Sequence, residues 1–183
     1  MNLALKILQE SKEKGKYLSI WNYNDDEKFW FGKILNFTEE IVVLQHFTKY
    51  GKKDGLLILQ ICDIKAIDFD DEYTNAMKLV IENSEKLATE DEFKFDFYDN
   101  ENWKFILLNQ LKFKTEIITS IEIENDYFTG FIKDVDEENF VINLVGSLGQ
   151  DEGNSIYKIE DLKSFRVNDI DNRKRLLLYN SRK

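Results

Sequence analysis

Very few side chains in this chain could act as nucleophiles, general bases or metal ligands. His46 is the only histidine, so a Ser/His/Asp triad could form at most once and a site with several histidine ligands cannot form. Cys62 is the only cysteine, which excludes an intramolecular disulfide and favours the role of a small apolar residue. We therefore expect no enzymatic activity, no metal and no cofactor.

Two short segments have the composition of ligand sites but not their spacing. The acidic residues from Asp68 to Glu72 could offer oxygen ligands to Ca²⁺, yet they lack the spacing of an EF-hand loop, so we interpret them as a solvated strand end. The segment from Gly51 to Gly55 is too short for a phosphate-binding loop and is interpreted as a turn. The 35 Asp and Glu residues single out no pair for acid–base catalysis.

One aromatic segment has the composition of a protein-binding site. Three consecutive aromatic residues place rings on both faces of a strand, whereas a core needs only one of those faces. Trp is a frequent anchor at interfaces, and the acidic residues of the preceding turn could steer a basic partner toward it. The candidate binding residues are Phe29, Trp30 and Phe31 with Asp25, Asp26 and Glu27. Internal packing of the same rings is the alternative.

The net charge of −10 sets the expectations about partners. A strongly acidic chain repels polyanions, so generic nucleic acid is not an expected partner. All four arginines fall between Arg166 and Arg182, in a stretch that we interpret as a turn, with a local anion site as the alternative. No apolar run approaches the roughly 18 residues that span a membrane, and no signal peptide is recognisable, so we expect a cytoplasmic protein.

The chain repeats itself at a constant offset of 98 residues. Residues 32–83 align without a gap to residues 130–181, and 13 of these 52 positions are identical. The identities include three glycine pairs, among them Gly32 with Gly130. Such self-similarity indicates a duplicated structural unit.

Each copy is predicted to begin with a helix and to continue with strands. Asn2 and Gly15 are suitable caps for a helix over about residues 3–14, with a counterpart at about 101–112. Segments rich in Ile, Val and aromatic residues, separated by polar turns, predict five strands. Their ranges are 17–23, 29–37, 40–47, 56–68 and 77–82, each repeated 98 residues later.

The predicted fold is mainly β, with two tandem units of one helix and five strands. The first unit is predicted at 1–83 and the second at 99–183. Between them, residues 84–98 contain Phe93, Phe95 and Phe97 in alternation with polar residues, which predicts an extra strand joining the units. Five short antiparallel strands with a helix in front favour a small closed or nearly closed barrel, whose edge strands could support an oligomer.

The order of a helix and five strands, with the sequence of Gly32 to Leu44 on strands two and three, resembles the first motif of the Sm-like family, with SH3-like barrels as the nearest alternative. In that family an acidic residue and an RNA-binding asparagine follow the glycine. The acidic position reads Thr38 and Asp136 here, and the asparagine position reads Val42 and Phe140. The resemblance therefore implies the barrel without the groups that contact bases.

These observations favour a non-enzymatic binding protein whose partner is another, basic protein, of the inhibitor, immunity or adaptor type. Binding of RNA or a small nucleotide at the junction of the two barrels is the alternative that the resemblance to Sm-like proteins implies. Fold alone does not decide between them.

Overall fold

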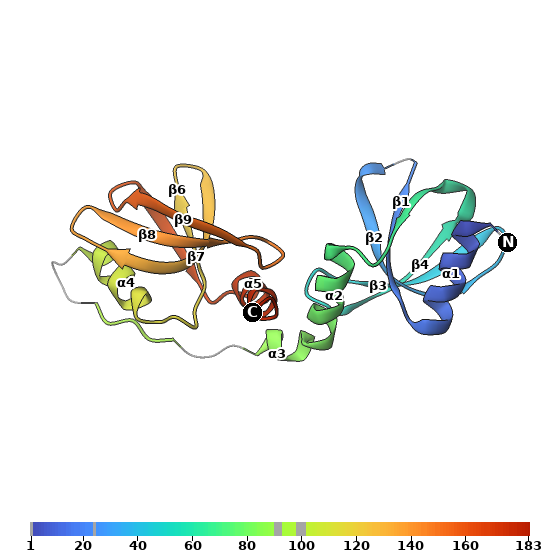
Figure 1. Ribbon diagram of the computed structural model, residues 1–183, viewed down its shortest axis with the longest axis horizontal. Coiled ribbons are helices and arrows are strands. Elements are labelled where there is room, and N and C mark those ends of the chain that lie inside the picture. Colours follow the sequence, from blue (N-terminus) through green and yellow to red (C-terminus); the bar gives the residue numbers. More distant parts are fainter. Residues whose placement is uncertain (1, 24, 90–92, 98–101) are drawn as a thin grey trace. The chain divides into compact units, whose positions relative to one another are not determined.

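The chain folds into two compact units, Met1–Ser84 and Glu85–Lys183, as the computed structural model shows (Figure 1). The structure describes residues 2–23, 25–89, 93–97 and 102–183.

The first unit contains a five-stranded antiparallel sheet with a helix before it and another after it. Its strands lie in the order β4-β3-β2-β1-β5. The elements are α1 (Leu3–Lys14), β1 (Tyr17–Asn22), β2 (Asp25–Phe37), β3 (Ile41–Phe47), β4 (Lys53–Gln60), a 3₁₀ turn (Ile61–Asp63), β5 (Ile64–Asp68) and α2 (Glu72–Glu82).

The second unit repeats this arrangement. Its strands lie in the order β10-β6-β7-β8-β9, which is the same topology when the strands are matched in sequence order. The elements are α3 (Ser84–Ala88, which begins at the unit boundary), α4 (Trp103–Lys112), β6 (Thr119–Ile123), β7 (Asp126–Val135), β8 (Asn139–Val145), β9 (Asp151–Lys158), β10 (Leu162–Val167) and α5 (Ile170–Asn180).

The strand pairing confirms the tandem repeat. Ile41 pairs with Gln60 in the first sheet, and Asn139 pairs with Lys158 in the second, so both partners are displaced by 98 residues. The helices α2 and α5 begin and end at the same offset. The helix predicted over residues 3–14 is also confirmed, because Asn2 caps α1 and Gly15 ends it with a φ of 68°.

The constant offset fails at the first strand of each unit. Leu18 pairs with Gly32, whereas Thr119 pairs with Gly130, so the β1–β2 hairpin is three residues longer than the β6–β7 hairpin. The additional residues are absorbed where the register of β1 and β2 shifts, between Trp21 and Asn22. A wide bulge can take up extra residues without moving the rest of the sheet.

Two of the predicted strands are wrong. Residues 77–82 belong to α2, and their counterparts 175–180 belong to α5. The apolar residues of α2 follow a helical period, since Thr74, Met77 and Val80 are its buried residues, and a capping box at Asp71 starts the helix. The count of five strands is still correct, because the segment 56–68 is interrupted by the 3₁₀ turn and forms both β4 and β5.

Neither sheet closes into a barrel, contrary to the prediction. Closure of the first sheet would require β4 to pair with β5, and of the second β9 with β10, but these strands lie at opposite edges. The described part of the chain therefore forms two open sheets with two edges each. Edge strands expose backbone groups that can pair with another chain.

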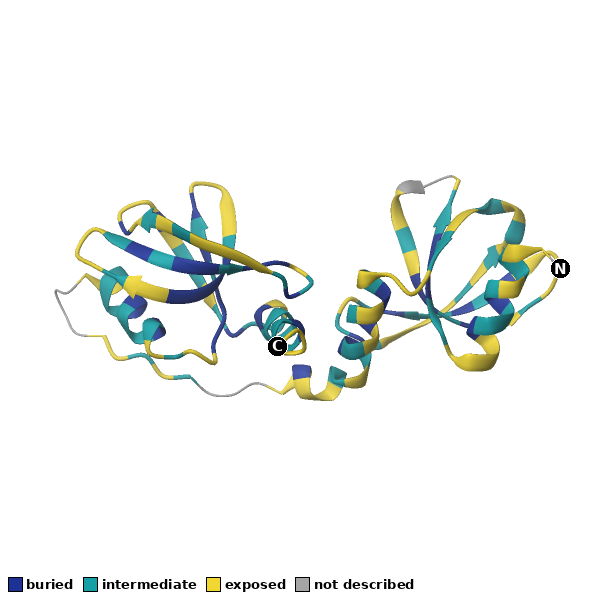
Figure 2. Ribbon diagram, in the orientation of Figure 1, coloured by how far each residue is buried: buried dark blue, intermediate teal, exposed yellow. Residues whose placement is uncertain are grey.

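A helix packs against each face of both sheets, although α2 covers its face only in part. One face of the first sheet carries the aliphatic core of Leu18, Ile20, Val42 and Leu44, onto which Leu8 of α1 packs. The opposite face is covered in part by α2, where Tyr73 packs edge-on against Phe29 and Phe31. In the second unit α4 and α5 take the corresponding places, with Tyr179 of α5 against Phe131. Figure 2 shows buried residues alternating with more exposed ones along the strands and helices of each unit.

The segment between the repeats does not contain the predicted strand. Residues 84–88 form α3, and residues 93–97 have no regular secondary structure; residues 90–92 and 98 lie outside the described part. Phe93 and Phe95 nevertheless pack against the core of the second unit. The amide of Gln110 bonds both backbone groups of Asp96, so an extended segment is held by a side chain rather than by a strand.

Two of the three repeated glycine pairs mark places where the backbone must come close, whereas a Cβ at Gly55 or Gly153 would meet nothing within 4 Å. A Cβ at Gly32 would lie 2.1 Å from the carbonyl oxygen of Gln45, and one at Gly130 would lie 1.9 Å from that of Asn143. Gly51 has a φ of 79°, and a Cβ there would lie 2.7 Å from the backbone of α2. These positions explain why the two copies keep the same glycines.

Candidate functional site

The structure separates the three aromatic residues predicted to bind a partner. Phe31 is buried, at 3% exposure, and stacks on Tyr17. Phe29 is half-buried between Trp21 and Tyr73. Only Trp30 reaches the surface, at 36% exposure. Internal packing against α2 thus accounts for two of the three rings.

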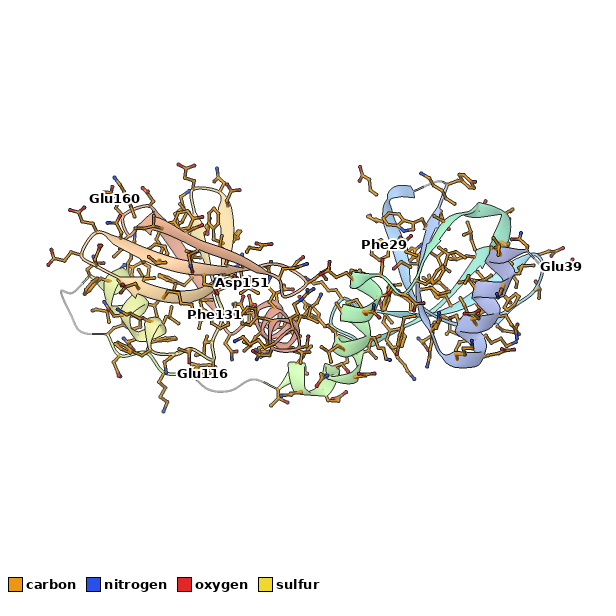
Figure 3. The ribbon with its side chains drawn as sticks, viewed as in Figure 1. Phe29, Glu39, Glu116, Phe131, Asp151 and Glu160 are labelled. Carbon is orange, nitrogen blue, oxygen red and sulfur yellow. The ribbon has the colours of Figure 1, made fainter. Side chains whose placement is uncertain are left out.

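The acidic part of the predicted site is only partly described. Glu27 is exposed on β2, whereas the side chains of Asp25 and Asp26 lie outside the described part of the structure. In Figure 3 Phe29 marks the position of this segment on β2. The acidic turn therefore stays a prediction.

Trp30 belongs to a row of three side chains that crosses β2, β3 and β4. The ring of His46 meets the indole edge-on, with centroids 5.4 Å apart. His46 Nδ1 lies 2.9 Å from the carbonyl oxygen of Phe31, which can only accept, so this nitrogen carries the proton. Nε2 lies 3.9 Å from a carboxylate oxygen of Asp54. These contacts hold the exposed indole in place.

A second exposed surface was not predicted from the sequence. It lies on the face that α2 covers in part, beyond the end of that cover. Leu56 and Ile58 are 58% and 67% exposed, and both point out of the edge strand β4. Ile58 pairs across the sheet with Val43. We call this surface the apolar face; its residues are Leu35, Ile41, Val43, Leu56 and Ile58.

The second unit provides an internal control for the apolar face. Its corresponding residues are Lys133, Asn139, Val141, Asn154 and Ile156, at the same places in the same topology. Three of the five are polar, and the unit forms the same sheet. Folding therefore does not require apolar residues at those three positions, and another cause must be found for them in the first unit.

The edge next to the apolar face lacks the usual protection. The edge strands β5 and β10 carry Lys65 and Lys163 within the strand, and β9 ends on Lys158. In β4, by contrast, four aliphatic residues run from Leu56 to Leu59 and are followed by Gln60. Lysines on edge strands discourage pairing with another chain. The lysine of β4, Lys53, is its first residue, so the run from Leu56 to Gln60 contains no such residue.

The arginines make contacts within the second unit. Arg173, Arg175 and Arg182 donate to the carbonyl oxygens of Leu87, Val145 and Leu148, respectively, at 2.7 to 3.0 Å. Arg166 lies over the ring of Tyr127, 4.5 Å from its centroid. The stretch is a strand end and a helix rather than the expected turn, and these contacts supply no support for an anion site.

A polar depression of about 580 Å³ lies at the start of α4. Trp103 and Glu138 contribute to its wall. Lys104 donates to the carbonyl oxygen of Glu160, and Lys158 pairs with the Glu160 carboxylate at 3.1 Å. Its cations are thus engaged within the unit. Glu160 is labelled in Figure 3.

The described side chains contain no group of three or more His, Cys, Asp or Glu that could hold a metal ion. No helix in the described residues is both long and apolar enough to cross a membrane.

The chain was compared with protein families, with curated proteins and with solved structures, and none of the three comparisons finds a match. The resemblance to Sm-like proteins therefore rests on the strand pattern alone. At the asparagine position of that family, Val42 and Phe140 are fully buried in the two cores.

The apolar face can be recognised in the sequence from differences between the two copies. At the offset of 98, Leu35, Ile41 and Leu56 align with Lys133, Asn139 and Asn154. Positions that are apolar in one copy and polar in the other are free of the demands of the fold. Differences between the two copies, in addition to identities, therefore indicate this face in the sequence.

Proposed function

We propose that the protein is a non-enzymatic binding protein of the adaptor or inhibitor type, which acts by contact with another protein. The apolar face of the first unit carries this proposal. Isolated exposed apolar residues are common on proteins, but four exposed ones grouped around the half-buried Val43 beside an open strand edge are typical of an interaction site. The polar residues at three of the same positions in the second unit support this interpretation.

Charge and the exposed indole support a basic partner. A net charge of −10 raises the association rate with a positively charged protein. Trp30, fixed by His46, is a second contact on the opposite face of the sheet. A rigid aromatic side chain in a partly buried setting is the usual anchor of an interface.

The test exchanges the apolar face for the residues that the protein itself uses in the second unit. The variant Leu35→Lys, Ile41→Asn and Leu56→Asn keeps the fold, because Lys133, Asn139 and Asn154 are compatible with it. Partners captured from the native host by the parent chain are identified, purified and titrated against the variant. We expect the variant to lose binding by about 2 kcal/mol or more, roughly 30-fold in Kd.

The matched control is Ile156→Asn, which changes an equally exposed residue in the second unit, at 65% exposure. It should bind as the parent does. A partner that binds the triple variant as tightly as the parent contradicts the proposal. The variant Trp30→Ala, measured against the same partner, decides whether the opposite face takes part.

A further inference from the structure

The edge strand β4 and the apolar face form one continuous surface. Leu56 and Ile58 project from the same strand whose outer backbone groups have no neighbouring strand in the described part of the first unit. A strand added to β4 would satisfy these backbone groups and would bring its own alternate side chains next to Leu56 and Ile58. The occupant of this surface is thus an extended chain with apolar residues at every second position.

β4 itself has that composition. Its exposed side chains at Leu56 and Ile58 alternate with Leu57 and Leu59, which pack into the core. Two copies of β4 related by a twofold axis run antiparallel, and each presents the other with the same pattern. An isologous pair therefore needs no further sequence element.

The charges at the two ends of β4 are complementary under this symmetry. Lys53 lies at the start of the strand and is exposed. The end of the strand lies beside the β2–β3 turn, because Ile61 donates to the carbonyl oxygen of Glu40. Glu39 and Glu40 are exposed at that turn, and Figure 3 shows Glu39 at this end of the unit. Antiparallel pairing brings Lys53 of one copy toward these carboxylates of the other.

We propose that β4 pairs antiparallel with β4 of a second copy of this chain, so that the apolar faces of two first units form one surface. This inference rests on the proposed function, since it names an occupant of the same face. The contact is small, and interfaces below about 1,200 Å² belong to weak pairs. The dimer should therefore form within a concentration range that can be followed directly.

The test measures the mass of the full chain by sedimentation equilibrium from about 5 to about 500 µM, where micromolar affinities are resolved. The parent is expected to shift from monomer to dimer. Ile58→Lys, which places a lysine on the edge, should stay monomeric. Ile156→Lys makes the same change at an equally exposed position of the second unit and should still dimerise. A parent that is monomeric throughout, or an Ile58→Lys variant that still dimerises, overturns the proposal.

The direction of pairing is tested with a spin label on Cys62, the only cysteine, which is exposed just beyond β4. Labelled chain is mixed with ¹⁵N chain in which Cys62→Ser prevents labelling. Antiparallel pairing predicts broadening at the amides of Lys53 to Gly55 in the ¹⁵N chain. Broadening at residues 60–63 alone indicates parallel pairing and contradicts the proposal.

Failure of this inference is distinct from failure of the proposed function. A monomeric parent whose triple variant loses a captured protein leaves the function in place with a different occupant. An extended segment of that other protein is then the strand added to β4.

Discussion

Thr38 and Asp136 occupy equivalent turns, and both side chains accept hydrogen bonds from the turn backbone, one through a hydroxyl and the other through a carboxylate. The Thr38 hydroxyl accepts from the backbone N–H groups of Glu40 and Ile41, and the Asp136 carboxylate accepts from those of Glu138 and Asn139. The backbone hydrogen bonds to Asp136 lower the pKa of its carboxyl group. The side chain that caps the second turn therefore titrates, whereas the hydroxyl that caps the first turn does not.

The sign of that dependence follows from the lowered pKa. An unfolded Asp titrates near pH 3.9, so the stabilisation by Asp136 is complete only above about pH 5 and is lost as the pH falls through the lower folded value. Asp136→Thr keeps the turn with the residue of the first unit and removes the titration. We expect the variant to lose less stability than the parent between neutral and acid pH.

Hydrogen exchange of the β7 and β8 amides, followed against pH, measures this effect in the second unit alone. The β2 and β3 amides of the same samples are the control and should not change with the substitution. Equal acid dependence in parent and variant would show that other groups govern this hairpin.

Gly51 and Gly55 differ in why glycine fits there: both have a left-handed backbone, but only Gly51 also lies too close to a neighbour for a Cβ. Both have positive φ, but a Cβ at Gly55 meets open space, whereas one at Gly51 meets the backbone of α2. Gly55→Ala should cost about 1–2 kcal/mol for the left-handed backbone, and Gly51→Ala should cost clearly more. Urea unfolding measures both variants. Equal losses would show that the turn can move away from α2 freely.

At the scale of the elements, Tyr73 adds an aromatic contact to the cover of the first sheet by α2, beside the buried Thr74, Met77 and Val80. Tyr73 packs against Phe29 and Phe31, and burial raises the pKa of its phenol. Tyr73→Ala should destabilise the unit by about 3 kcal/mol, whereas Tyr73→Phe keeps the ring and should cost less than about 1 kcal/mol. Urea unfolding gives the free energies, and hydrogen exchange in α2 locates the loss. A small effect of Tyr73→Ala would contradict this role of the ring.

Some of the helices and strands could be predicted from the sequence, and others could not. The offset of 98 and the caps of α1 were readable, because identical residues and cap chemistry are local signals. Residues 77–82 were mistaken for a strand, since a short apolar run fits both periods until the buried positions of α2 are known. The three extra residues of the first hairpin left no gap in the aligned range, because that range begins at Gly32.

The candidate site was predicted less well than the fold. Trp30 lies at the surface, but Phe29 and Phe31 pack against α2, where the sequence predicts a strand at residues 77–82 instead of a helix. When α2 is not recognised as a helix, the rings of Phe29 and Phe31 have no predicted packing partner on their face of the strand. The apolar face was missed for the opposite reason, because alternating apolar residues on β3 and β4 look like ordinary core until the edge is known.

At the scale of the whole molecule, charge and burial together argue against binding of single-stranded RNA. The net charge is −10, and both residues at the asparagine position of the Sm-like motif are buried. We expect no binding in a filter titration with generic single-stranded RNA at physiological salt. Sub-micromolar affinity with a steep dependence on salt would contradict this and would favour the nucleic-acid alternative.

The restriction of the apolar face to one unit determines how far an assembly of this chain can grow. A chain with an adhesive edge in both repeats would be bivalent, and successive chains could join into a fibre. Here the second edge ends on Lys158 and carries Asn154 and Ser155, so the proposed pairing through β4 gives the chain a valence of one. A twofold contact of valence one is saturated by a single neighbour, and the assembly terminates at two. Replacing Lys133, Asn139 and Asn154 by Leu, Ile and Leu would give the second unit a pairing edge as well, and chains could then join beyond the dimer.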